Sequence, residues 1–382
     1  MNVVRRIFFW LHLSVGVVAG VVIGLMAVTG FLLAYERPIK TQFGQPHLPE
    51  LAQSVTPPGV DAILQSLGQS PQGEPSQLVV HRDDRQPMEA RWGRESTLLI
   101  DGRTGQAIGR PSARMQRFFR FVEDLHRSIG FGMQNAFGRG LAGAATLCFL
   151  FILLSGLWLW FPRSFNWAGF RARLLFRRGL KARAREWNHH HVVGVWLLLP
   201  LLVIVASGLV MAYPWANNLL YTMTGSQPPQ DGHHDGHHDG HGEREAGKGT
   251  AKQPAQPGPA LEPVLRSAAA SVPEWQTLTV SVPAAKSKTI AVAADTSQGG
   301  RPEKVTNLTF DAKTGRLVGV QRFSDNVLGR RLRAWARTLH TGEEFGLGGR
   351  TVAALSTLGA FYLVWTGLAL SWRRFFGAGG TL

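Results

Sequence analysis

Residues 12–35 have the sequence HLSVGVVAGVVIGLMAVTGFLLAY, and residues 190–213 have the sequence HHVVGVWLLLPLLVIVASGLVMAY. Each stretch begins with a histidine and ends with Ala-Tyr, and neither contains Asp, Glu, Lys or Arg. A helix needs about 20 mainly apolar residues to cross a bilayer. The two stretches therefore predict two membrane-spanning helices of related sequence.

Two further apolar runs have a similar length and also lack charge, so the predicted spans are 8–35, 142–161, 192–213 and 351–372. Each run is too long for an ordinary buried helix of a soluble domain. The first run is also too long for a signal peptide and lacks a small-x-small cleavage motif, which predicts an uncleaved anchor. The chain is therefore expected to be an α-helical membrane protein.

Positive charge is concentrated beside these spans. Arginines flank the first and fourth spans, and the connection between the second and third holds eight basic residues: Arg163, Arg171, Arg173, Arg177, Arg178, Lys181, Arg183 and Arg185. Short basic loops remain in the cytoplasm. Both termini are therefore predicted inside, and the long loops, about 36–137 and 214–348, outside. The net charge of +16 reflects this topology and external arginines, so no nucleic-acid partner is expected.

The two halves of the chain resemble each other. Ala34-Tyr35 recurs as Ala212-Tyr213 and Thr29-Gly30 as Ser207-Gly208, in each case 178 positions later. Leu153-Leu-Ser-Gly-Leu157 likewise recurs as Val364-Trp-Thr-Gly-Leu368. A bundle built from two parallel repeats is therefore predicted, and in this register His12 matches His190.

The long loops repeat as well. Asp101 with Thr104-Gly105 matches Asp311 with Thr314-Gly315, and each motif follows a short strand-like stretch, 97–100 or 307–310. Such a motif between apolar residues predicts a hairpin turn without catalytic chemistry. Each loop is expected to form a small α+β module. The single cysteine, Cys148, lies in the second span, which excludes an intramolecular disulfide.

The predicted organisation follows the chain in ten segments. These are the first span (1–35), the first outer module (36–111), an amphipathic segment (112–137), the second span (138–162), a basic loop (163–187), the third span (188–213), the second module (214–321) with an insert (225–263), a second amphipathic segment (322–348), the fourth span (349–372) and a tail (373–382). The insert contains the tract His233–His241 and is expected to be disordered. Metal binding by this tract is the alternative to a solvated insert without a defined site.

With four spans, His-x-x-x-Gly at the start of spans one and three, and two outer D-x-x-T-G turns, the chain resembles the PepSY-associated transmembrane family of bacterial inner-membrane proteins. The resemblance covers nearly the whole chain. It is strongest to members that bind two b-type haems and reduce ferric siderophores of the ferrioxamine type in the periplasm. It implies inner-membrane localisation with two periplasmic PepSY-like modules.

Four histidines are the candidate axial ligands of two haem irons: His12 with His190 on the cytoplasmic side, and His126 with His340 on the periplasmic side. Imidazole is a standard haem ligand, and two imidazoles leave no open position for oxygen. His190 is chosen from a run of three histidines by repeat register alone, and His191 is the second choice. The alternative is that these histidines cap helices or meet lipid headgroups.

The outer pair lies on predicted amphipathic helices. Apolar residues at helical spacing precede His126 and His340, and arginines occupy the remaining positions around each helix. Four arginines are candidate partners of haem propionates, because guanidinium pairs with carboxylate at two points: Arg120, Arg127, Arg337 and Arg350. Contact with lipid phosphates is the alternative. Glycines 16, 20 and 24 predict close helix packing, or else room for a macrocycle.

Two functions compete at this point. In the first, the protein is a ferric-siderophore reductase that passes electrons from an unidentified donor, a quinol or a cytoplasmic reductase, through two haems b to a periplasmic ferric siderophore, which then releases Fe(II). In the second, it is a non-redox membrane module whose PepSY-like part binds a periplasmic partner or peptide. A proton-coupled transporter is disfavoured, because the four spans lack ionisable groups at their centres.

Overall fold

The chain forms two compact units in the computed structural model, which describes residues 3–44, 48, 57–93, 96–162, 167–228, 260–283, 287–297 and 299–376. Met1–Thr41, Arg114–Pro228 and Leu328–Leu382 make up a helical unit. Gln42–Ala113 and Pro229–Val327 make up a sheet unit. The tract His233–His241, expected to be part of a solvated insert with metal binding as the alternative, lies outside the described residues.

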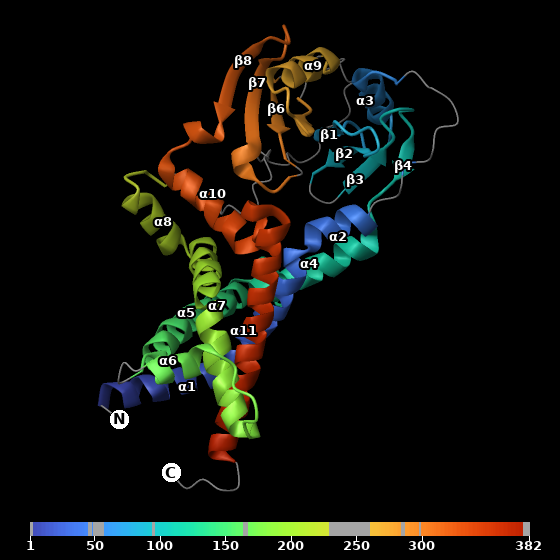
Figure 1. Ribbon diagram of the computed structural model, residues 1–382. Coiled ribbons are helices and arrows are strands. Elements are labelled where there is room, and N and C mark those ends of the chain that lie inside the picture. The colour runs from blue at the N-terminus through green and yellow to red at the C-terminus, as the bar shows by residue number, and fades with distance from the viewer. Residues whose placement is uncertain are drawn as a thin grey trace. The chain divides into compact units, whose positions relative to one another are not determined.

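Four long helices dominate the helical unit (Figure 1). They are α1 (Val3–Ala34), α5 (Ala136–Trp160), α7 (Ala182–Ala212) and α11 (Gly346–Phe375). All four are long and apolar enough to cross a membrane, the last together with the preceding 3-10 turn η3 (Glu343–Phe345). The predicted spans are thus confirmed, and the protein is a membrane protein.

The long helices pack as a four-membered ring, in which α1 and α7 each lie against both α5 and α11. Small and branched apolar residues fill the centre: Ala27, Leu153, Leu201, Val205 and Ala360. A Cβ atom added at Gly20 or Gly24 would lie 3.6 Å from a methyl group of Val364 on α11. These two glycines therefore serve close helix packing, whereas a Cβ at Gly16 would meet nothing within 4 Å.

Shorter helices complete this unit. The two predicted amphipathic segments form α4 (Ala113–Ser128) and α10 (Leu328–Thr341), with His126 and His340 in their last turns. The others are α2 (Glu36–Phe43), α6 (Trp167–Leu174) and α8 (Pro214–Met223). His126 and His340 thus occupy equivalent places at the ends of two amphipathic helices.

The sheet unit contains eight antiparallel strands in the order β4-β3-β2-β1-β5-β6-β7-β8. The first loop contributes β1 (Gln77–His81), β2 (Met88–Trp92), β3 (Ser96–Ile100) and β4 (Ala107–Gly109). The second contributes β5 (Thr277–Ser281), β6 (Thr289–Asp295), β7 (Val305–Asp311) and β8 (Leu317–Arg322), with the 3-10 turns η1 (Pro302–Lys304) and η2 (Phe323–Asp325). Because β1 pairs with β5, with Leu78 opposite Val280, the strands of both loops form one sheet.

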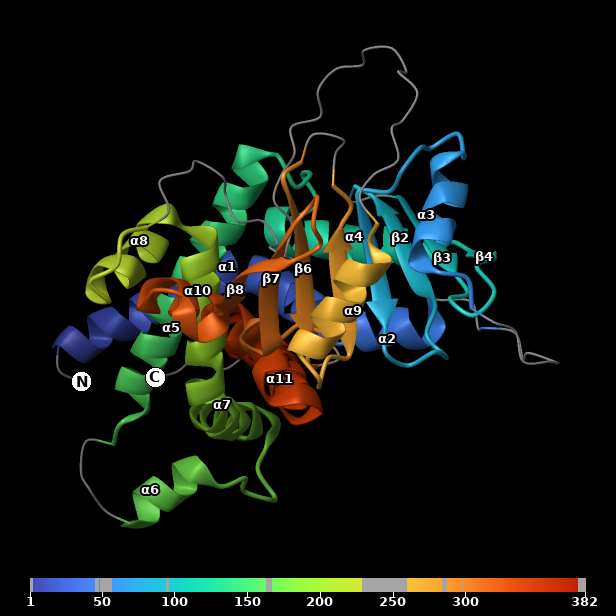
Figure 2. The same cartoon turned by 90° about the horizontal axis from the view of Figure 1, so that it is seen from above.

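Two helices, α3 (Val60–Gly68) and α9 (Glu262–Ser271), cover one face of this sheet (Figure 2). Their N-termini cap each other. The Asp61 carboxylate accepts hydrogen bonds from the Leu261 and Glu262 amides at 2.6 and 3.3 Å, and the Glu262 carboxylate accepts one from the Val60 amide at 2.8 Å. Negative charge beside helix N-termini satisfies otherwise unpaired amides, so the capping links the two loops.

Both D-x-x-T-G motifs form hairpin turns, as predicted. Gly105 and Gly315 adopt φ angles of 72° and 66°, which favour glycine. The Asp101 carboxylate is 2% exposed and accepts hydrogen bonds from the amide and the guanidinium of Arg103, each at 2.9 Å. These hydrogen bonds lower the pKa of Asp101 from its ordinary value of 3.8.

We expect Asp101→Asn to destabilise the β3-β4 hairpin by about 1–3 kcal/mol at pH 7, because Arg103 loses its charged partner. Since the folded-state pKa is depressed, this contribution is present above about pH 4 and declines as the pH falls through the folded value. Hydrogen-exchange mass spectrometry of β3 and β4 peptides should therefore show a difference at pH 7 that shrinks toward pH 3. Asp311→Asn, in the exposed turn, is the control with the smaller expected effect, and a pH-independent difference would contradict this account.

Candidate functional site

Each of four histidines in the helical unit lies against a Ser-Gly or Thr-Gly pair on a neighbouring long helix. His12 contacts Ser155-Gly156 of α5, His190 contacts Thr366-Gly367 of α11, His126 contacts Thr29-Gly30 of α1, and His340 contacts Ser207-Gly208 of α7. In that order, the imidazole Nδ1 atoms lie 2.9, 2.9, 3.0 and 3.3 Å from the hydroxyl oxygens. One contact therefore recurs four times.

The hydroxyl protons of these Ser and Thr residues are already used. Each hydroxyl donates to the carbonyl four residues earlier in its own helix: Ser155 to Phe151 at 2.7 Å, Thr366 to Tyr362 at 3.0 Å, Thr29 to Leu25 at 2.8 Å and Ser207 to Val203 at 2.6 Å. A hydroxyl has only one proton, so its oxygen can only accept from the imidazole. The Nδ1 atoms of His126 and His340 also lie 3.0 and 2.8 Å from the carbonyl oxygens of Met26 and Ile204, which likewise can only accept. This network assigns the proton to Nδ1 and leaves the Nε2 lone pair available to a metal.

The glycine of each pair gives the imidazole its space. A Cβ atom built at Gly30 or Gly208 would lie 3.3 or 3.2 Å from the Cε1 atom of the packed histidine, and one at Gly156 would lie 3.3 Å away. The looser contact, at Gly367, is 3.5 Å. The hydroxyl and the glycine together therefore fix both the tautomer and the position of each ring.

The histidines occupy two levels of the bundle. On α1, His12 and the partner of His126, Thr29, are 17 residues apart, and on α7 the same interval separates His190 from Ser207. At about 1.5 Å per residue, each interval spans about 25 Å along the helix. The pairs His12/His190 and His126/His340 therefore belong to separate sites, one near each end of the long helices.

The second pair has the spacing of two ligands of one metal. The ring centres of His126 and His340 are 6.3 Å apart. Two metal–nitrogen bonds of about 2 Å, with each ring centre about 1.1 Å behind its nitrogen, place two in-line imidazoles about 6.3 Å apart. Burial lowers the pKa of His340, and burial together with His340 lowers that of His126 to about 4. Both rings are thus neutral at pH 7, the form that binds metals.

The first pair includes a choice among three neighbouring histidines. His12, His190 and His191 are close enough to interact electrostatically. His190 has the hydroxyl contact with Thr366 that the other three histidines have with their partners. The Nδ1 atom of His191 instead lies 2.9 Å from the Trp187 carbonyl of its own helix, and the His191 ring stacks on that tryptophan at 4.0 Å.

Two imidazoles cannot satisfy a metal by themselves. Across the described parts of the chain, no three side chains of His, Cys, Asp or Glu gather at a potential metal site. Structural zinc sites require about four protein ligands. A haem iron requires only axial ligands from the protein, since the macrocycle supplies the others. The paired imidazoles therefore fit haem better than a bare metal ion.

Two of the four candidate arginines meet beside the outer pair. Arg337 and Arg350, together with Arg37, lie 3.6–3.8 Å from the carboxylate of Glu343. Three guanidinium groups thus lie around one carboxylate, and neither Arg350 Nε nor Glu343 Oε2 has a hydrogen-bond partner within the described structure. Arg127 pairs with Glu123 at 2.8 Å on exposed α4, where Arg120 is also exposed. Of the four candidate arginines, Arg337 and Arg350 are therefore the two that share a carboxylate with other guanidinium groups.

Residues 9–374 match the family described as the PepSY-associated TM region. The chain belongs to this family. The match spans both units and includes all four histidines with their Ser/Thr-Gly partners. No curated protein matches the chain.

Sequence reasoning about this PepSY-associated protein missed the partners of the histidines. The pairs Thr29-Gly30, Ser207-Gly208, Ser155-Gly156 and Thr366-Gly367 were recognisable as repeated, but only as markers of register. These pairs recur in the same repeat register as the histidines, and this was the one sequence feature that could have indicated the contact between them. Arg37 and Glu343 had no such indication, because the chain separates them by three hundred and six positions.

We expect Gly30→Ala and Gly208→Ala to displace the packed imidazoles by a few tenths of an ångström. Ligand affinity at the outer pair should fall about tenfold, as it does when the orientation of metal ligands is disturbed. If the ligand is the haem expected from the sequence, its retention during dilution, followed by absorbance, measures this effect. Gly20→Ala and Gly24→Ala add the same methyl at an ordinary contact distance and should have no effect, so an equal loss in all four variants would contradict the prediction.

Proposed function

We propose that the protein is a haem-dependent ferric-siderophore reductase of the bacterial inner membrane. The observation that carries this proposal is the hydrogen bond from Nδ1 to a Ser or Thr hydroxyl, which recurs at His12, His126, His190 and His340. It leaves the Nε2 lone pair of each imidazole available to a metal. Two such imidazoles per site match the needs of a six-coordinate haem iron that exchanges electrons without binding oxygen.

Two haems b are proposed, one per level. Each would supply an iron that takes up and gives up one electron at a time. His12 and His190 would hold the first, and His126 and His340 the second, so that each half of the chain contributes one ligand to each site. The proposed parallel repeat explains this sharing, because an axis between the halves brings equivalent histidines face to face.

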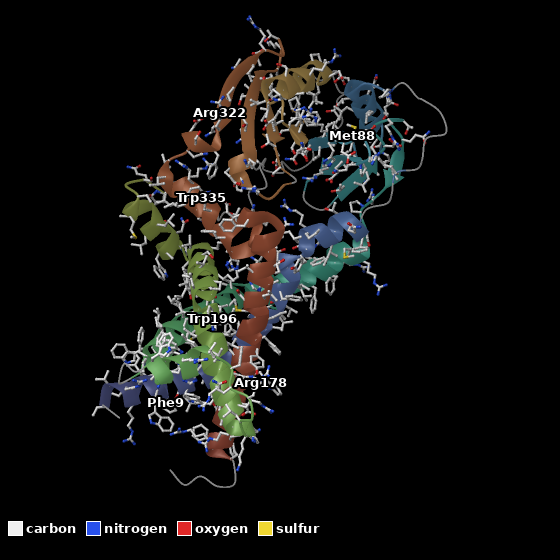
Figure 3. All side chains as sticks on the ribbon, viewed as in Figure 1. Phe9, Met88, Arg178, Trp196, Arg322 and Trp335 are labelled. Atoms are coloured by element: carbon white, nitrogen blue, oxygen red, sulfur yellow. The ribbon has the colours of Figure 1, made fainter. Side chains whose placement is uncertain are left out.

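The proposed orientation follows the distribution of charge. The basic loop between α5 and α7 lies at the end of the bundle that carries Phe9 and Arg178 (Figure 3). If this end is cytoplasmic, as the positive-inside rule predicts, His12 and His190 lie on the cytoplasmic side and His126 and His340 on the periplasmic side. Both termini would then be cytoplasmic, and the strands of the sheet unit would belong to periplasmic PepSY-like modules.

The arginines at Glu343 suit the propionates of the outer haem. Propionates are anionic, and guanidinium groups pair with carboxylates at two points. Arg37, Arg337 and Arg350 surround one glutamate, and the Arg350 Nε–H has no hydrogen-bond partner within the described structure, so it is available to a second anion. Glu343 keeps the arginines in place and limits their mutual repulsion.

The proposed substrate is a ferric siderophore at the periplasmic side. Hard oxygen ligands of the hydroxamate type prefer Fe(III) to Fe(II). One-electron reduction therefore weakens the chelate and allows Fe(II) to leave. The chain's residues contribute by holding two redox centres at fixed orientation on opposite sides of a barrier that excludes ions.

The first test is haem content. Purified protein should contain two low-spin haems per chain, with a Soret band and split α and β bands after reduction. His12→Ala or His190→Ala should remove one haem, and His126→Ala or His340→Ala the other, because each variant loses one of two axial ligands. A colourless protein after haem-supplemented expression would refute the proposal and favour the non-redox alternative, a module that binds a periplasmic partner.

A second test concerns the arginine cluster. We expect Arg350→Gln to weaken retention of the haem at His126/His340 by about tenfold, because a two-point charged contact is lost. Arg127→Gln, which removes a guanidinium from the exposed pair with Glu123, is the matched control. The rate of haem release to a haem-scavenging protein is measured for both variants. Equal rates would contradict a contact between Arg350 and a propionate.

Activity is tested in vesicles. With a reductant enclosed and a ferric hydroxamate outside, wild-type protein should produce Fe(II), detected with an external Fe(II)-specific dye. The His126→Ala variant should not, because the electron no longer reaches the outer side. Fe(II) formation at the wild-type rate by this variant would overturn the proposed route.

A further inference from the structure

The histidine next to His190 takes part in a second interaction. His189 Nδ1 lies 2.7 Å from the hydroxyl of Tyr362 on α11. The rings are tilted by 42° with centres 6.2 Å apart. The partner of Nδ1 is thus a phenol, so the pair still has the Nε2 atom of His189 and a lone pair of the phenol oxygen for another polar group.

This polar pair lies on an otherwise apolar surface. On α11, Tyr362 is 36% exposed, and the residues one turn away on the same side, Leu358 and Trp365, are exposed as well. On α7, Trp196, labelled in Figure 3, and Leu199 are exposed beyond His189, and the Trp196 indole donates a hydrogen bond to the Leu174 carbonyl of the adjoining loop at 2.9 Å. Both helices are candidate membrane spans, so we expect the exposed side chains on this side, away from the loop, to face lipid. A partner of the pair must therefore be soluble in the membrane.

The adjoining loop is fixed beside His189. Asn188 is 1% exposed; its side chain accepts a hydrogen bond from the Arg177 amide at 2.9 Å and donates one to the Leu175 carbonyl at 3.2 Å. This anchoring places the Phe176 ring edge-on to His189, with centres 5.1 Å apart. An exposed aromatic ring thus lies next to the polar pair, as a planar ligand requires.

The pair has no counterpart in the other half of the chain. In the register that matches His12 to His190, His189 corresponds to Leu11, and in the register that matches Ser155 to Thr366, Tyr362 corresponds to Phe151. In the first half, His12 makes its contact with Ser155 although the positions equivalent to His189 and Tyr362 are apolar. The His189–Tyr362 pair is therefore not needed to position the neighbouring histidine, His190.

The pair is also directly coupled to a proposed haem ligand. The Thr366 hydroxyl donates to the Tyr362 carbonyl at 3.0 Å and accepts from His190 Nδ1 at 2.9 Å. A molecule bound at the pair would thus lie beside His190, on the lipid side. Glu186, one turn before His189, pairs with Arg373 at 2.9 Å and marks the polar end of these helices.

We propose that His189, Tyr362 and Phe176 form the binding site of a membrane-soluble quinol, the electron donor of this protein. The ring hydroxyl of the quinol hydrogen-bonds to the His189–Tyr362 pair, its ring lies against Phe176, and its tail lies along the exposed side of α7 and α11. This inference rests on the proposed function. Oxidation of one quinol to quinone releases two protons to water at the membrane surface and reduces two ferric chelates by one electron each.

The test is photolabelling of the full-length protein in lipid nanodiscs with an azido-quinone, followed by mass spectrometry. We expect the label on peptides that contain residues 176, 189 or 362, and its displacement by unlabelled quinone. His189→Leu and Tyr362→Phe install the residues of the other half and should lower labelling about tenfold, as expected for the loss of a buried hydrogen bond. Tyr35→Phe is the control, because it removes a phenol hydroxyl that lies 3.3 Å from Thr351 Oγ1 between α1 and α11.

Haem absorbance separates this inference from the proposed function. Haem content and reduction by dithionite should be unchanged in all three variants. Labelling elsewhere in the wild-type protein, full labelling of Tyr362→Phe, or loss of haem from that variant would overturn the quinol site. A wild-type protein without haem would instead overturn the proposed function, whereas one with two haems and no quinone label would overturn the donor site alone.

Discussion

The hydrogen bond between an imidazole Nδ1–H and a hydroxyl that is already bound to its own helix is the constraint on which the candidate site depends. A Ser or Thr that donates to the carbonyl four residues earlier can only accept from the histidine, so the tautomer follows from the helix itself. The adjoining glycine leaves room for the ring. Two consecutive residues on one helix thereby orient a ligand that belongs to another.

This device also explains the arrangement of the four long helices. Each of them carries one Ser/Thr-Gly pair, and each pair holds a histidine from a different helix: α5 and α11 hold those of α1 and α7, while α1 and α7 hold those of α4 and α10. The contacts of His12 and His190 thus join α1 to α5 and α7 to α11, and those of His126 and His340 attach α4 to α1 and α10 to α7. Close packing at Gly20 and Gly24 separately joins α1 to α11 in this ring.

Departures from the repeated pattern indicate where the two halves differ in function. His189 and Tyr362 replace an apolar pair, Leu11 and Phe151, on a lipid-facing surface. At the other level, the guanidinium groups of Arg37, Arg337 and Arg350 converge on the carboxylate of Glu343. The first feature suits the proposed quinol in the membrane, and the second suits the propionates of the proposed outer haem.

The sequence by itself determined the four spans, the amphipathic helices that end near His126 and His340, and the two hairpin turns, because hydrophobic period and turn chemistry are local properties. It also identified the histidines, since their register is visible in a repeat. Only the tertiary structure decided which hydroxyl each imidazole meets, that β1 pairs with β5 in one sheet, and that Arg37 joins Glu343. These contacts join segments far apart in the chain, and their geometry depends on how helices and strands pack, which no local pattern encodes.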